Sequence, residues 1–211
     1  MAPSADHVAA VAHLAGADPA MARLIDTVGP CTLGPRRIPG GAFGSLARAI
    51  AYQQLAGPAA RAIHARFALL YGGRPTAAAV LATPDEHLRS VGLSAAKTAS
   101  IKDLAAKVLD GTVRLRNVSA LSDHEVVARL STVRGIGRWT AEMFLIFDLM
   151  RPDVWPVDDL GVRKGWAIAH GHRNELPMPK ELEMLGDPCR PHRSVAAWYC
   201  WRAVSLTGGE W

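Results

Sequence analysis

The chain has 211 residues, enough for one large domain or two small lobes, and 49% of them are apolar, which supports a buried core. The net charge of +5 is mild but compatible with a polyanionic partner. Three scattered cysteines without a C-x-x-C pair argue against a disulfide framework and a zinc knuckle. We see neither a signal-peptide pattern nor an apolar run of the ~20 residues that span a bilayer, so we expect a cytoplasmic protein that does not contact membranes.

The first part of the chain predicts a series of helices. Asp18-Pro19 is typical of a helix start, and the helix is expected to run to about residue 28. Residues 29–42 are rich in proline and glycine and predict a loop. Apolar residues at helical spacing then predict helices over 43–57 and 58–72.

Further helix signals follow. Thr83-Pro84-Asp85-Glu86 predicts a capping box at the start of a short helix. A helix is predicted over 97–109, and a connection, with a fragment of helix, over 112–121. Two more helices are expected over 159–169 and from about His192 onward, with a polar loop between them. Because alanine is abundant and no stretch reads as a strand, we expect an all-α protein with eight to ten helices.

The stretch around Gly135-Ile136-Gly137 carries the strongest local pattern. Ser122 and Glu125 form an S-x-x-E capping box for a helix that leads into it, and a second helix begins near Trp139. A Gly-x-Gly turn that opens a helix presents backbone N–H groups at the helix's positive end, where anions bind. An ordinary tight turn between two helices is the simpler interpretation of this motif alone.

Twenty residues after Trp139 comes the pair Asp158-Asp159. Both aspartates are suited to capping the helix that follows, and Asp158 could cap it while Asp159 points elsewhere. A carboxylate fixed beside a phosphate-binding turn also suits cleavage of a glycosidic bond, because it stabilises the positive charge that develops on the sugar. Such a reaction on a DNA base requires the base to leave the stack first.

With these residues in view, the chain resembles the helix-hairpin-helix (HhH-GPD) DNA glycosylases, and within them the 3-methyladenine DNA glycosylase II family. The matching stretches follow the family's order over nearly the whole chain. They are 48–56 (R-A-I-x-x-Q-Q-L-A), 92–97 (G-L-S-x-x-K), 130–144 (L-S-T-V-R-G-I-G-R-W-T-A-E-M-F), 151–161 (R-P-D-V-x-P-x-D-D-L-G) and 190–199 (R-P-x-R-S-V-A-A-W-Y).

The resemblance implies an all-α fold of two helical lobes with a DNA-binding cleft between them. The central lobe is expected over about 43–152 and the second over 1–42 plus 153–211, without the β-rich N-terminal domain of some bacterial members. The implied partner is double-stranded DNA with damaged bases, and we expect the protein to act as a monomer.

The resemblance also implies roles for individual residues. Asp159 matches the catalytic aspartate. Leu55, with Gln54 beside it, matches the wedge that fills the gap left by the flipped nucleotide. The amides of the hairpin glycines, helped by a threonine hydroxyl, are implied to hold a DNA phosphate; these residues are Gly135, Gly137 and Thr140.

The base pocket and the cofactors are implied in the same way. The pocket positions are Trp139, Met143, Cys189 and His192, of which the last three depart from the aromatic residues that are common there. Related enzymes that also cut the strand have a lysine at position 139, so tryptophan predicts a monofunctional enzyme that leaves an abasic site. No cofactor is required and no iron–sulfur cluster is expected, since the four spaced cysteines are missing. A sodium or potassium ion on the carbonyls of the hairpin turn is implied at Ser131, Val133 and Gly135.

Three hypotheses follow. The first is a glycosylase for N-alkylated purines. The second is a damaged-DNA-binding module without catalysis, against which the intact Asp159 argues. The third is a glycosylase of shifted specificity for deaminated or exocyclic-adduct bases, which would need a general acid, for which Glu142 and His192 are the candidates.

Other residues have simpler interpretations. Any one of Arg134, Arg138, Lys97 and Lys102 is expected to be an ordinary surface charge rather than a phosphate ligand. The tryptophans outside the hairpin are expected in the core; they are Trp155, Trp166, Trp198 and Trp201.

Overall fold

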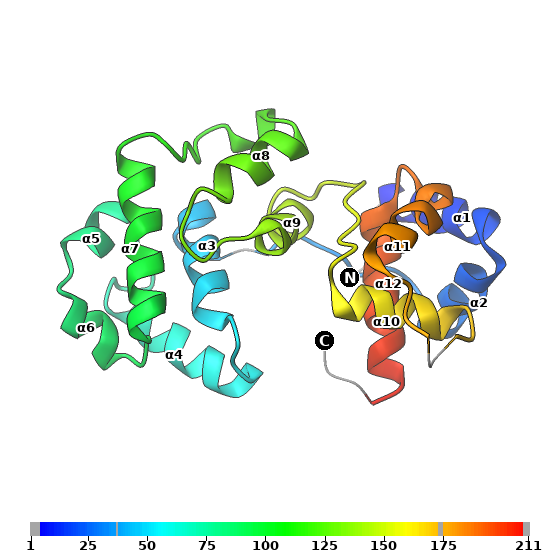
Figure 1. Cartoon of the computed structure of the whole chain (residues 1–211), viewed down its shortest axis with the longest axis horizontal. Helices are drawn as coiled ribbons and strands as arrows, with labels where there is room; N and C mark the ends of the chain where they lie inside the picture. Colours follow the sequence, from blue (N-terminus) through cyan, green and yellow to red (C-terminus); the bar gives the residue numbers. More distant parts are fainter. Residues whose placement is uncertain (1–4, 37, 173–174, 209–211) are drawn as a thin grey trace. The chain divides into compact units, whose positions relative to one another are not determined.

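A computed structural model describes residues 5–36, 38–172 and 175–208. The chain divides into two compact units, one formed by residues 36–149 and the other by 1–35 together with 150–211. Every regular element in the described ranges is a helix, which confirms the all-α prediction (Figure 1). None of the described helices combines the length and the apolar character needed to cross a membrane.

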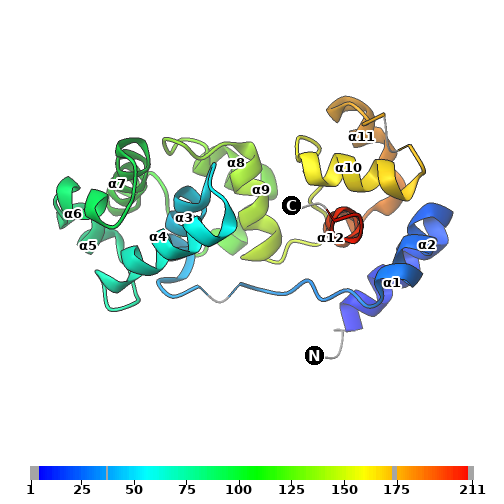
Figure 2. The same cartoon turned by 90° about the horizontal axis from the view of Figure 1, so that it is seen from below.

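The unit formed by both ends of the chain is built on α12, which contacts α1, α2 and α10. Figures 1 and 2 show α10 lying alongside α12. Its core includes Leu14, Met21 and Tyr199, which are fully buried. The helices of this unit are α1 (Ala5–Ala17), α2 (Pro19–Val28), α10 (Leu160–Ala169), α11 (Pro179–Leu185), the 3₁₀ turn η2 (Asp187–Cys189) and α12 (Arg193–Leu206).

The unit of residues 36–149 is built around α7, which contacts α3, α5 and α6. Helix α9 packs against α3 and α8. Ile50, Phe67 and Ile101 are fully buried in this unit. Its helices are α3 (Gly41–Tyr52), α4 (Gly57–Leu69), α5 (Ala77–Ala82), α6 (Asp85–Ser90), α7 (Ala95–Leu109), η1 (Val118–Ala120), α8 (Asp123–Leu130) and α9 (Arg138–Phe147).

Two of the predicted helix starts have the expected geometry. The side chain of Asp18 accepts the N–H of Ala20 at 2.8 Å, with Pro19 at the first helical position of α2. Ser122 and Glu125 form the complete reciprocal capping box of α8. The helical fragment in the 112–121 connection is also present, as η1.

The capping box predicted at Thr83 is wrong. The Thr83 hydroxyl donates to the carbonyl of Ala79 at 2.8 Å, one turn back along α5. Thr83 therefore ends α5 instead of starting α6, which has Pro84 at its N-cap position and no side-chain cap. The prediction failed because α5 was not foreseen, and its last carbonyls compete for the threonine hydroxyl.

Other boundaries also differ from the predictions. Helix α3 stops at Tyr52, since Gln53 has a non-helical ψ of 134° and Gln54 then adopts a left-handed φ of 55°. Helix α1 was not predicted, and the expected polar loop before α12 contains α11 and η2. In the described ranges there are twelve α-helices and two 3₁₀ turns, more than the eight to ten expected.

Two glycines one helical turn apart let α10 approach α12 closely. A Cβ built on Gly165 would lie far inside contact distance of the Cys200 carbonyl, so the two backbones touch there. A Cβ on Gly161 would come within 2.8 Å of the Trp201 ring. Neither glycine has a positive φ, so both are needed for space and not for backbone conformation.

We predict that Gly165→Ala lowers the free energy of unfolding by at least about 2 kcal/mol, because the methyl group must push two backbones apart. Gly16→Ala in α1 is the matched control, since a Cβ there meets nothing within 4 Å. The control is expected to be neutral or stabilising by about 0.5 kcal/mol. Urea unfolding of both variants measures the difference, and equal stabilities would contradict the close approach.

Candidate active site and nucleic-acid interface

The turn between α8 and α9 has two glycines with different structural demands. Gly135 has a φ of +77°, and a Cβ on it would lie 2.8 Å from the Ser100 hydroxyl. The fold itself therefore requires glycine at this position. Gly137 has an ordinary φ of −98° as the N-cap of α9, and a Cβ on it would meet nothing within 4 Å. Nothing in the folded unit explains why residue 137 is a glycine.

Side chains of helix α7 hold this turn by forming hydrogen bonds with backbone groups of the turn. The Arg134 N–H donates to the Asp103 carboxylate at 2.7 Å, and the Lys107 ammonium donates to the Thr132 carbonyl at 2.6 Å. Lys107 and Asp103 also form an ion pair at 2.7 Å. Burial alone would raise the pKa of Asp103, but its bonds from Lys107 and Arg134 outweigh burial and lower it. The sequence analysis missed this pair, because i,i+4 pairs of this kind usually lie on solvated helix faces.

Gln53 joins the turn to the loop that follows α3. Its side-chain amide donates to the Gly135 carbonyl at 2.7 Å and lies 3.5 Å from the Thr140 hydroxyl. Thr140 itself is buried. The left-handed Gln54 comes next and turns the chain, leaving Leu55 38% exposed. The structure thus brings the predicted wedge and the predicted phosphate-binding turn together within one unit.

The pocket candidates of α9 lie on its outer side. Trp139 is 45% exposed, which is unusual for a large aromatic residue, and Met143 is half-buried. Glu142 is buried, and its Oε1 accepts from the Arg138 guanidinium at 2.8 Å. This carboxylate, one of the two candidate general acids, is therefore engaged within its own helix.

The three carbonyls of the expected cation site lie in the same turn. The Val133 carbonyl accepts the Ile136 N–H at 3.0 Å, and the Gly135 carbonyl accepts the Gln53 amide. A carbonyl oxygen has two lone pairs, so each can accept one hydrogen bond and still coordinate a cation. With the carbonyl of Ser131, the donor set is neutral oxygen, which suits a sodium or potassium ion.

Asp159 is the N-cap residue of α10. Its Oδ1 accepts the N–H of Val162 at 2.8 Å and the indole N–H of Trp201 at 2.9 Å. The residue is only 8% exposed, whereas Asp158 lies on the surface. Asp159 is thus the cap, and the hypothesis that Asp158 caps the helix while Asp159 points elsewhere is wrong.

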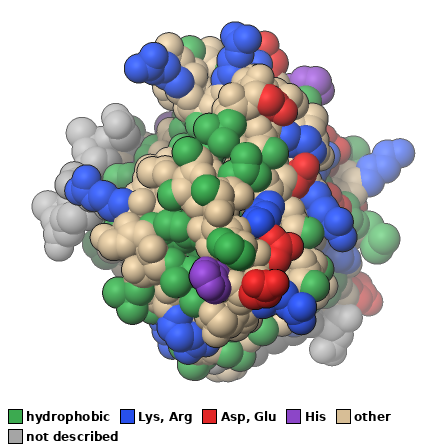
Figure 3. Space-filling model, turned by 90° about the vertical axis from the view of Figure 1, so that its left-hand side faces the viewer, with side chains coloured by type: hydrophobic (Ala, Val, Ile, Leu, Met, Phe, Trp, Pro, Cys, Tyr) green, Lys and Arg blue, Asp and Glu red, His purple; other side chains and the backbone are tan. Residues whose placement is uncertain are grey.

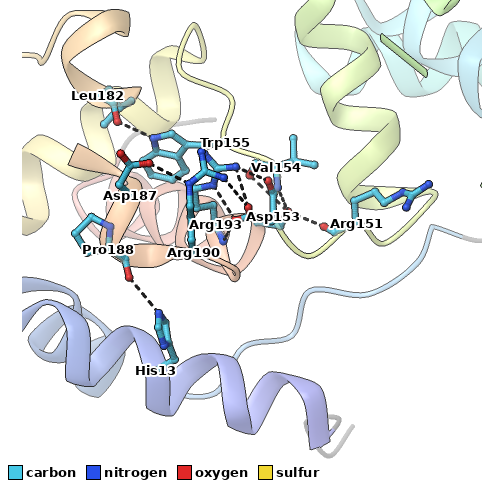
Figure 4. A network of polar contacts seen from close by, with 11 residues as sticks. His13, Arg151, Asp153, Val154, Trp155, Leu182, Asp187, Pro188, Arg190 and Arg193 are labelled. Carbon is cyan, nitrogen blue, oxygen red and sulfur yellow. Dashed lines mark hydrogen bonds and ion pairs between the residues drawn. The ribbon is translucent and has the colours of Figure 1, made fainter. Parts of the chain in front are cut away.

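A polar network fixes the segment that leads to Asp159 (Figure 4). The Asp153 carboxylate accepts from Arg193 at 2.7 Å and from Arg190 at 3.0 Å. The Ser194 hydroxyl donates to the Arg151 carbonyl at 2.6 Å and accepts the Val154 N–H at 2.9 Å. The Arg-Pro-x-Arg-Ser stretch therefore anchors residues 151–154 to the start of α12.

The remaining pocket candidates also lie near the start of α12. Cys189 is fully buried in η2, and burial raises the pKa of its thiol to about 12. It is therefore neutral and unsuited to be a nucleophile. His192 is half-buried, and its ring meets the edge of the His13 ring at a centroid distance of 5.3 Å.

Most of the cationic side chains singled out from the sequence have partners within the protein. Lys97 donates to the Ala51 carbonyl at 2.7 Å at the end of α3, and Lys102 pairs with Asp85. Figure 3, which views the side of the molecule on which α5 and α6 lie, shows charges of both signs interspersed with apolar side chains. That face offers no uniform positive patch for a polyanion. The four tryptophans expected in the core are all buried, which confirms that prediction.

Comparison with known proteins identifies the family. Residues 47–191 match the model of the HhH-GPD superfamily of base excision DNA repair proteins. The chain belongs to this superfamily. The match spans the loop after α3, the hairpin turn and Asp159, and it ends at Pro191, within the Arg-Pro-x-Arg-Ser stretch.

Two similar proteins and one solved structure extend the comparison. DNA-3-methyladenine glycosylase 1 of Schizosaccharomyces pombe is 37% identical over 203 residues, covering 92% of this chain and 86% of that protein. The alkylbase DNA glycosidase-like protein mag2 of the same organism is 32% identical over 212 residues, covering 98% of each. The structure of S. pombe 3-methyladenine DNA glycosylase (Mag1) in complex with abasic DNA has a TM-score of 0.83, covering 93% of this chain and 97% of that one.

We predict that Gly135→Ala and Gly137→Ala affect different properties, the first the stability of the fold and the second the affinity for DNA. Gly135→Ala strains a left-handed residue against α7 and is expected to cost about 1–2 kcal/mol of stability. Gly137→Ala is expected to leave stability unchanged but to weaken binding to duplex DNA, because its methyl group lies where a phosphate would approach the α9 N-terminus. Thermal unfolding and fluorescence anisotropy with labelled duplex measure the two properties. Wild-type DNA affinity in Gly137→Ala would contradict the phosphate-binding interpretation.

Proposed function

We propose that this protein is a monofunctional DNA glycosylase of base excision repair that removes N-alkylated purines, such as 3-methyladenine and 7-methylguanine, from double-stranded DNA. Membership of the HhH-GPD superfamily and the 3-methyladenine glycosylase names of its relatives support the substrate class. The observation that carries the proposal is the buried, doubly hydrogen-bonded carboxylate of Asp159, the residue to which the sequence resemblance assigns the catalytic role.

The chemistry needs little beyond a fixed negative charge. The C1′–N bond breaks, its electron pair leaves with the base, and the sugar becomes an oxocarbenium-like cation. Water then adds to C1′ and loses a proton. Alkylation at N3 or N7 gives the base a positive charge, so it departs as a neutral molecule without a general acid. The Asp159 carboxylate stabilises the cation on the sugar.

The exposed residues of the other unit supply recognition. Trp139 presents an electron-rich indole face, which attracts a cationic base. Leu55, exposed after the left-handed Gln54, fills the space that the flipped nucleotide leaves in the stack. Tryptophan has no amine to form a Schiff base with the sugar, so the product is an uncut strand with an abasic site.

The hairpin turn sets the register on the DNA backbone. Gly137 caps α9 without a side chain, so a phosphate oxygen can approach the first-turn N–H groups. The carbonyls of residues 131, 133 and 135 would hold a monovalent cation that adds positive charge and stiffens the turn, without taking part in the reaction.

Asp159→Asn is the direct test. Asparagine caps helices as well as aspartate does, so the variant keeps the α10 cap and removes only the charge. We expect excision of 7-methylguanine from a duplex to fall by roughly 10²–10³-fold, with unchanged thermal stability. Strand cleavage by hot alkali after the reaction measures excision, and gels run without alkali are expected to show intact strands.

Asp158→Asn is the matched control, since Asp158 is the exposed neighbour and makes no cap bond. It is expected to keep wild-type excision. Wild-type activity in Asp159→Asn would overturn the mechanism. A panel of hypoxanthine and ethenoadenine duplexes separates the alternatives: preference for these neutral bases would indicate shifted specificity, and release of no base at all would indicate a binding module.

A further inference from the structure

Asp159 shares one carboxylate oxygen between two donors that come from different helices. Oδ1 accepts the Val162 N–H of its own helix at 2.8 Å and the Trp201 indole N–H of α12 at 2.9 Å. Trp201 is 2% exposed, so the indole bond is shielded from water. The two oxygens of a carboxylate are rigidly joined, so holding Oδ1 from two directions fixes the plane of the whole group.

The close packing of α10 on α12 makes this contact possible. A Cβ on Gly161 would lie 2.8 Å from Trp201 Cδ1 and 3.0 Å from Asp159 Oδ1, so any larger residue would separate the indole from the carboxylate. One turn later, Gly165 lies directly against the backbone of Cys200, the neighbour of Trp201. Two glycines thus clear the space through which the indole reaches Asp159.

We infer that Trp201 is a positioning residue for the reaction, whose indole N–H holds the Asp159 carboxylate in the orientation that stabilises the sugar cation. The inference rests on the catalytic role proposed for Asp159. The Val162 N–H restrains Oδ1 from one direction, and the indole N–H restrains it from a second. This second restraint narrows the orientations of the carboxylate before substrate binds, so the charge has less reorientation to undergo in the transition state.

Trp155 provides a matched control within the same unit. Its indole N–H donates to the Leu182 carbonyl at 2.8 Å, and the side chain is 5% exposed. Replacing either tryptophan with phenylalanine keeps an aromatic ring in the core and removes one buried hydrogen bond. The two substitutions should therefore lower thermal stability to a similar degree, but only Trp201→Phe affects Asp159.

The experiment measures single-turnover excision of 7-methylguanine by the full chain, together with affinity for a duplex that contains an abasic-site analogue. We expect Trp201→Phe to slow excision between about 10- and 100-fold, as the loss of a hydrogen bond to a charged group predicts, with DNA affinity within twofold of wild type. Trp155→Phe is expected to keep the wild-type rate. Gly161→Ala, which displaces the indole without changing it, is expected to slow excision as Trp201→Phe does.

A double-mutant cycle with Asp159→Asn tests whether Trp201 acts through the carboxylate. If it does, Trp201→Phe has no further effect on the residual rate of Asp159→Asn. Equal rates in Trp201→Phe and Trp155→Phe, or a full additional loss in the double variant, would overturn the positioning role while leaving the proposed function intact. Wild-type excision in Asp159→Asn would instead overturn the proposed function, and the role of Trp201 with it.

Discussion

The close contact between α10 and α12 is the constraint on which the unit containing Asp159 depends. Two glycines at i and i+4 remove the side chains that would keep the helices apart, and the backbone of Gly165 meets that of Cys200. This contact sets the distance at which Trp201 meets Asp159. The polar network of Asp153, Arg190 and Arg193 fixes the segment that leads to α10 against the start of α12. The packing of the two helices and the polar network of Asp153 thus both restrain the part of the chain that carries the Asp159 carboxylate.

The hairpin turn in the unit of residues 36–149 is also held by neighbouring elements, but through hydrogen bonds from side chains. Side chains from α7 and that of Gln53 form hydrogen bonds with backbone groups of the turn, which include the Arg134 N–H and the Thr132 and Gly135 carbonyls. A short turn cannot bond to itself at these positions, so the neighbouring elements must provide the partners. Because the side-chain amide of Gln53 joins the turn to the Leu55 loop, the predicted phosphate-binding turn and the predicted wedge are linked through one residue.

The sequence predicted those features whose partners lie close along the chain. The Asp18 cap and the Ser122–Glu125 box were correct because donor and acceptor are two or three residues apart. The capping box predicted at Thr83 was wrong because the Thr83 hydroxyl donates to a carbonyl of α5, a helix that was not foreseen. The contacts between Gln53 and Gly135 and between Asp159 and Trp201 span 82 and 42 residues, so no local pattern could reveal them. Trp201 was correctly expected in the core, but its N–H had to find a partner there, and that requirement is readable from the residue type alone.

The two interpretations of Asp159 that the sequence left open, helix cap and catalytic carboxylate, are compatible for a physical reason. The cap bond uses one oxygen, and the Trp201 bond to the same oxygen helps to orient the other through the rigid carboxylate plane. Folding of α10 and its packing on Trp201 therefore order the carboxylate before any substrate arrives. The role proposed for Asp159 needs a carboxylate of fixed orientation, and the bond that starts α10 and the indole bond from α12 together restrain it.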